Sequence, residues 1–85
     1  MNSKAHKILE KVFTDPPPSD CTWGDIESLL RELVRDYRGI LSAGPGARTL
    51  ISLNGVKGVF PYPQRPNVGT IRYVREFLDT AGIKP

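Results

Sequence analysis

Gly46–Phe60 reads as two short strands that, paired as a hairpin, place most of their apolar residues on one side. Asn54-Gly55 lies between the strands and favours a type I′ turn, because both residues tolerate a positive φ. Such a turn fixes the register of a hairpin, since it leaves Leu53 opposite Val56. One side of this hairpin is then largely apolar and carries Thr49, Ile51, Leu53, Val56, Gly58 and Phe60. The other side carries Arg48, Leu50, Ser52, Lys57 and Val59.

Apolar residues at helical spacing predict three helices, over Asn2–Phe13, Thr22–Tyr37 and Thr70–Ala81. Thr22 and Asp25 have the spacing of a capping box at the start of the second helix. We expect Gly39 to end that helix, and Gly82 to end the last one in the left-handed conformation.

Charged residues on two of these helices also have predicted positions. Glu27 and Arg31 have the i, i+4 spacing of an ion pair along the second helix. On the last helix, Arg72 and Arg75 are expected to face solvent.

Arg38–Ser42 has a weak β-strand pattern, which predicts a first strand before the hairpin. With this strand, residues 22–83 have the order of an α-β-β-β-α layer. This predicts an α+β fold in which helices cover one face of a three-stranded antiparallel sheet, as in double-stranded RNA-binding domains. Residues 1–14 form an extra N-terminal helix, and the Pro-rich residues 15–20 a stiff connector within one domain, 1–85. The predicted core contains Ile26, Leu29, Leu30, Leu33, Ile51, Phe60, Val74, Phe77 and Leu78.

The composition favours some classes of partner and argues against metal, cofactor and membrane-spanning classes of protein. The 85 residues carry a net charge of +3 and a pI of about 9.3, which favours a polyanionic partner without requiring one. With one Cys and one His, a protein-only metal site is not expected, nor is a cofactor in so small a domain. The chain has no apolar run of membrane-spanning length and no signal peptide pattern, so we expect a cytoplasmic protein.

Three stretches together resemble one family. Trp23-Gly24-Asp25-Ile26 looks like its first-helix signature, and Gly69-Thr70-Ile71 through Ala81-Gly82-Ile83 looks like its closing helix. The Gly-rich turn, hairpin and Pro-rich loop between them resemble its central segment. The family is HicA, the small toxin of type II toxin–antitoxin pairs, and the resemblance runs from about Trp23 to Ile83.

The resemblance implies a metal-independent endoribonuclease that cuts mRNA and is neutralised by a HicB-like antitoxin. The family's catalytic His lies in a Gly-Ser-His step, and the corresponding step here is Gly46-Ala47-Arg48. Arg stays protonated, so Arg48 cannot act as a base, although it can hold a phosphate. Loss of general acid–base catalysis typically lowers a rate by ~10²–10⁴-fold. Whether the protein cleaves RNA is therefore left open.

The candidate site residues lie on the outer side of the hairpin and in the loop that follows it. Arg48 and Lys57, with Tyr62 and Arg65 in the loop, are the candidates for RNA binding. Leu50 and Val59 are the candidates for antitoxin binding, because they place an apolar patch on the same face. The first hypothesis is a HicA-like toxin acting on mRNA; a non-catalytic antitoxin-docking partner and a plain RNA-binding module are the alternatives.

Overall fold

The structure, a computed structural model, describes residues 2–16, 18, 20–46, 48–61 and 68–85. Its elements are α1 (Ser3–Val12), α2 (Trp23–Asp36), β1 (Ile40–Gly44), β2 (Arg48–Leu53), β3 (Val56–Pro61) and α3 (Val68–Thr80). The strands form one antiparallel sheet in the order β1-β2-β3. The predicted α+β class is confirmed, and the elements from α2 to α3 follow the predicted α-β-β-β-α order.

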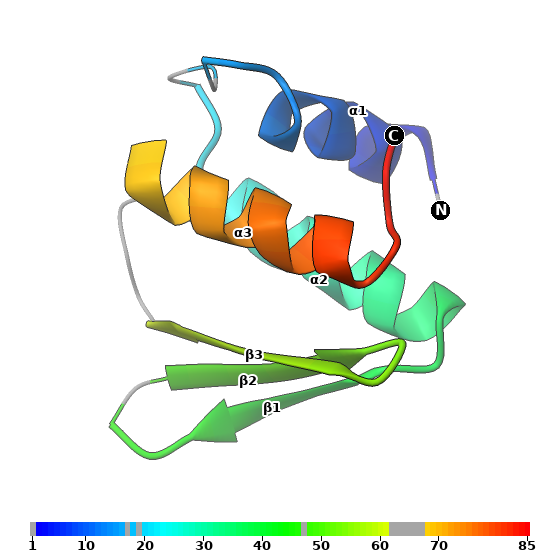
Figure 1. The fold of residues 1–85 in the computed structure, drawn as a ribbon, viewed down its shortest axis with the longest axis vertical. Coiled ribbons are helices and arrows are strands. Elements are labelled where there is room, and N and C mark those ends of the chain that lie inside the picture. Colours follow the sequence, from blue (N-terminus) through cyan, green and yellow to red (C-terminus); the bar gives the residue numbers. More distant parts are fainter. Residues whose placement is uncertain (1, 17, 19, 47, 62–67) are drawn as a thin grey trace.

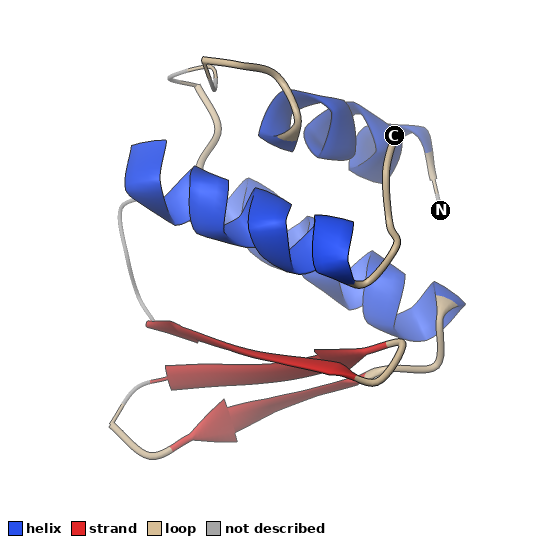
Figure 2. Cartoon of the chain, in the orientation of Figure 1, coloured by secondary structure: helices blue, strands red, loops and turns tan. Residues whose placement is uncertain are grey.

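The elements form three layers, as Figures 1 and 2 show. The sheet is the first layer, and both α2 and α3 lie on one of its faces, where α2 contacts β1 and β2 and α3 contacts β3. The helix α1 contacts α2 and α3 rather than the strands, so it forms a third layer. The apolar face of α1 is buried there, through Ala5, Ile8, Leu9 and Val12. The N-terminal helix is thus part of the packed structure.

The hairpin has the predicted register. Asn54 and Gly55 have φ values of 50° and 80°, as a type I′ turn requires, and Leu53 pairs with Val56. The side chain of Asn54 also donates a hydrogen bond of 2.8 Å to the carbonyl of Ala81. The turn is therefore tied to the C-terminal end of α3.

Local capping explains where the helices begin and end. Thr22 and Asp25 form the predicted capping box at the start of α2. At the end of α3, Gly82 has φ 77°, and the N–H of Ile83 donates to the carbonyl of Leu78 at 2.8 Å. This is the Schellman arrangement, which ends a helix on a left-handed residue. The helix bounds lie within two residues of those predicted.

The end of α2 differs from the prediction. The left-handed residue there is Arg38, with φ 54°, and not Gly39. Gly39 is required for another reason: a Cβ on it would lie 2.3 Å from the carbonyl oxygen of Ser52. Arg38 forms part of the turn that ends α2 and is therefore not part of the strand. As a result β1 starts at Ile40, two residues later than predicted, and runs to Gly44.

Replacing Arg38 with glycine is expected to raise the free energy of unfolding by about 0.5–1 kcal/mol. A left-handed non-glycine residue costs about 1–2 kcal/mol, and part of this gain is lost to the greater freedom of glycine in the unfolded chain. Urea denaturation measures the change. In the control, Arg72→Gly inside α3, the same substitution should destabilise by about 1 kcal/mol. Equal destabilisation by both would contradict this account of the turn.

All nine predicted core residues are buried, with at most 5% of each side chain exposed. Trp23 joins them and packs edge-on against Phe60, with ring centroids 6.3 Å apart. One expectation was wrong: Arg75 was predicted to face solvent. Instead its Nε donates to the carbonyl of Val12 and its Nη2 to that of Thr14, both at 2.9 Å, so it joins α3 to the end of α1.

Candidate nucleic-acid interface

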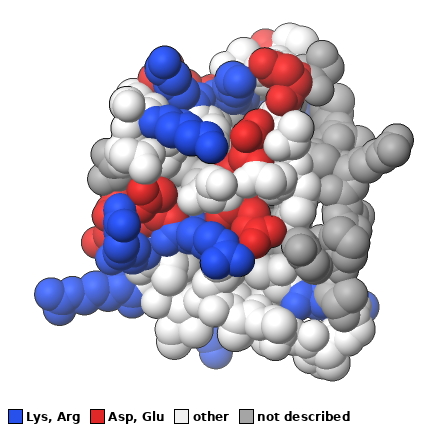
Figure 3. All heavy atoms as spheres, turned by 180° about the vertical axis from the view of Figure 1, so that it is seen from behind, with Lys and Arg blue, Asp and Glu red and all other residues white. Residues whose placement is uncertain are grey.

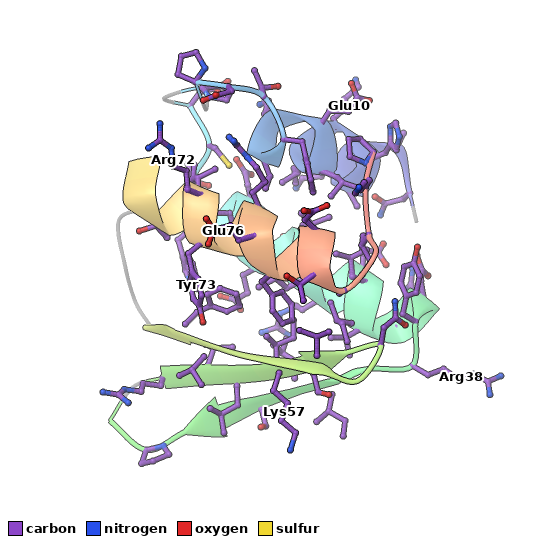
Figure 4. All side chains as sticks on the ribbon, viewed as in Figure 1. Glu10, Arg38, Lys57, Arg72, Tyr73 and Glu76 are labelled. Atoms are coloured by element: carbon purple, nitrogen blue, oxygen red, sulfur yellow. The ribbon has the colours of Figure 1, made fainter. Side chains whose placement is uncertain are left out.

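The outer face of the sheet is the face opposite α2 and α3. Strand alternation turns Arg48 and Leu50 of β2 and Lys57 and Val59 of β3 towards it, and all four are exposed. Figure 4 shows Lys57 pointing away from the helices. Within the described residues, none of the three helices contacts this face. The four hairpin residues predicted for the site therefore lie together on one open surface.

An apolar stripe crosses this face between two cations. Leu50 lies opposite Val59, and their exposed fractions are 36% and 42%. Ile40 of β1, with 66% of its surface exposed, adds apolar surface in the next row of this face, where it lies opposite Ser52. Arg48 and Lys57 lie on either side of it, because Lys57 pairs with Ser52, four residues along β2 from Arg48. Four residues of a strand span roughly 13 Å.

The charge around the sheet has one sign. The sequence from Tyr37 to Arg75 contains no Asp or Glu, but holds six of the twelve Lys and Arg residues. In Figure 3 the acidic side chains gather over the helices, and the few charged side chains of the lower part, where the sheet lies, are all Lys or Arg. An uninterrupted positive field of this kind attracts phosphate groups.

Four cations outside the sheet are in ion pairs with carboxylates, whereas Arg48 and Lys57 of the sheet are not paired with any described residue. Ion pairs join Lys11 to Asp20, Arg31 to Glu27, Arg35 to Glu32 and Lys84 to Asp79. Arg48 and Lys57 have no such partner and no side-chain hydrogen bond among residues 2–16, 18, 20–46, 48–61 and 68–85. Their charges are available to a ligand.

A hollow of about 350 Å³ opens beside Arg48, between β1 and α2. Glu27 and Arg31 of α2 line it, together with Leu41, Ser42, Ala43, Gly44 and Thr49 of the sheet. The Nη2 and Nε of Arg31 donate to one oxygen of Glu27, at 2.6 and 3.2 Å. The sequence predicted this pair as a contact along the helix, but not its place beside Arg48, which depends on how α2 crosses the sheet.

The chemistry available at the hollow favours binding over proton transfer. Its one described carboxylate, Glu27, already accepts two hydrogen bonds from Arg31. His6 lies on α1, where its Nδ1 is 2.8 Å from Glu10, outside the layer that faces the sheet. Burial raises the pKa of the Cys21 thiol, so this thiol is not an activated nucleophile. Arg48 can therefore hold a phosphate but has no described partner that would move a proton.

Two predicted site residues, Tyr62 and Arg65, lie outside the described residues. Ile40 was within the predicted first strand, Arg38–Ser42, but was not predicted as part of the surface, because the sequence pattern there was too weak to give the strand's pairing with the hairpin. The run without acidic residues was visible in the sequence and would have indicated the sheet as the charged surface.

No known protein family, characterised protein or solved structure matches the chain. Among the described residues, no three His, Cys, Asp or Glu side chains come together as metal ligands. None of the described helices has the length and apolar character needed to cross a membrane. Function therefore has to be inferred from the residues and their arrangement.

Proposed function

We propose that this protein is a HicA-like toxin that binds mRNA through the outer face of its sheet. The observation that carries the proposal is the open face itself: Arg48 and Lys57 are exposed and unpaired there within the described structure, in a stretch without acidic residues. The resemblance of three motifs to HicA, in the same order along the chain, supports the toxin class.

Arg48 and Lys57 would contact two phosphates of one RNA strand. The guanidinium of Arg48 can bind a phosphate with two parallel hydrogen bonds, and Lys57 adds a second charge. Each contact releases counterions, so affinity should fall as salt rises. Because the hollow beside Arg48 offers no free base among its described residues, we propose that the protein arrests translation mainly by holding mRNA.

The proposal extends to a fold like that of double-stranded RNA-binding domains and to a cytoplasmic location. The order from α2 to α3 matches that of double-stranded RNA-binding domains, and α1 is an addition to it, so residues 1–85 would act as one domain. An mRNA target implies the cytoplasm. Phosphate binding by Arg and Lys needs neither a metal nor a cofactor.

A HicB-like antitoxin is the second proposed partner. The observation that favours it is the exposed stripe of Ile40, Leu50 and Val59, which an antitoxin could cover together with the flanking cations. If docking such a protein is the sole function, RNA binding will be absent while Leu50→Asp still abolishes complex formation with the antitoxin.

Induced expression in a bacterial host tests the toxin proposal. The wild-type chain is expected to slow growth while leaving total RNA largely intact, because binding occurs without rapid cleavage. The double variant Arg48→Ala/Lys57→Ala should restore growth. Arg72→Ala, which removes a charge from the exposed surface of α3, is the matched control and should still slow growth. Equal growth arrest by all three proteins at equal expression would refute the proposal.

A further inference from the structure

The two edge strands of the sheet, β3 and β1, differ in whether their outward backbone groups have partners. At the β3 edge, the N–H of Val59 donates to the hydroxyl of Tyr73 at 3.4 Å, and Pro61 has no N–H to offer. Figure 4 shows Tyr73 reaching from α3 towards β3. The ring of Tyr73 also packs on Phe60, with centroids 5.0 Å apart. Neither Val59 nor Pro61 therefore offers a backbone N–H to a further strand at this edge.

The β1 edge is open, as the sheet register shows. Because the N–H of Val59 points away from β2, the pair Leu50–Val59 is not hydrogen-bonded, and Leu50 directs its backbone groups to β1. Ser42, the residue of β1 that pairs with Leu50, therefore directs its own backbone N–H and C=O groups to β2. The neighbours of Ser42, Leu41 and Ala43, therefore direct their N–H and C=O groups outward. No described residue pairs with them.

The hollow beside Arg48 adjoins this open edge. Leu41 and Ala43 line it together with Arg31, whose side chain is 67% exposed. Arg31 uses only two of its five N–H groups on Glu27, so it can still bind a carboxylate. A strand added to β1 would place its residues opposite Leu41 and Ala43 on the helix side of the sheet, at this hollow.

We propose that an extended acidic segment of a protein partner adds to the sheet at β1. Its carboxylates would face Arg31, and its alternate apolar side chains would lie on the outer face beside Ile40. The outward N–H and C=O groups of β1 alternate along its edge. Another peptide backbone can pair with this alternating pattern, whereas an RNA backbone cannot. A second copy of this chain would bring two acid-free sheets together, so charge opposes self-pairing. The inference does not depend on RNA binding.

The test uses an acetylated eight-residue peptide that alternates valine and glutamate, titrated into the isotope-labelled full chain without RNA. Amide exchange of Leu41 and Ala43 should slow at least about tenfold when the peptide is bound. Ala43→Pro removes an outward N–H without breaking a bond of the sheet, and should weaken binding at least about tenfold. Ala43→Ser keeps the N–H and is the matched control.

Charge supplies a second test, which needs no substitution in the strand. Arg31→Gln should weaken binding of the glutamate peptide several-fold, and a peptide that alternates valine and lysine should not bind. The proposal is overturned if both peptides bind alike, or if the glutamate peptide leaves the Leu41 and Ala43 amides unchanged. It is also overturned if sedimentation shows a dimer that Ala43→Pro dissociates, or if a single-stranded RNA slows the same two amides.

Discussion

Replacing Arg48 with histidine is expected to raise the rate of RNA cleavage by about 10²–10⁴-fold. A histidine there titrates near neutral pH and would take a proton from the 2′-hydroxyl of RNA held beside the hollow. Cleavage of a labelled RNA by the purified proteins measures the gain.

The matched control is Lys57→His, on the same face but outside the hollow that Arg48 lines. It should leave the cleavage rate at the wild-type level. If Arg48→His also leaves the rate unchanged while RNA binding persists, the hollow is not a site of RNA chemistry. Arg48 would then be a binding residue alone.

Replacing Leu30 with alanine is expected to lower the free energy of unfolding by about 2–5 kcal/mol. Only 1% of Leu30 is exposed, so the smaller side chain loses contacts with its neighbours and leaves a cavity in the core. Leu50→Ala, on the open face, should change stability by less than about 1 kcal/mol. Urea denaturation at an unchanged m-value compares them; similar losses would contradict the assignment of faces.

Helices and the hairpin could be predicted because their signals are local. The capping box of Thr22 and Asp25 and the turn at Asn54-Gly55 depend on residues within one turn of the chain, and each was found where the sequence predicted it. The nine core residues followed from the same periodicities, since each element has one apolar face to bury.

Other features could not be predicted because they depend on contacts between distant segments. Arg75 bonds the end of α1, more than sixty residues away in the sequence, although its position on the helix resembled a solvated one. The left-handed Arg38 was missed because a glycine follows it, and that glycine is needed for the approach to Ser52. The exposure of Ile40 was missed because it follows from the pairing of β1 with β2, which no local signal in the sequence indicated.

The candidate site could be predicted in part. Strand alternation correctly placed Arg48, Leu50, Lys57 and Val59 on one exposed face. The hollow beside Arg48 could not be predicted, because α2 supplies Glu27 and Arg31 to it across the layer boundary. The roles of these residues in binding RNA or an antitoxin stay predictions.

RNA affinity measured as a function of salt tests the central claim most directly. With a single-stranded RNA as probe, the slope of log affinity against log salt should become shallower by about 1.4 in Arg48→Ala/Lys57→Ala, because each lost phosphate contact changes the slope by about 0.7. Arg72→Ala should keep the wild-type slope. A wild-type protein whose RNA affinity does not change with salt, or a double variant with the wild-type slope, would contradict RNA binding by the open face of the sheet.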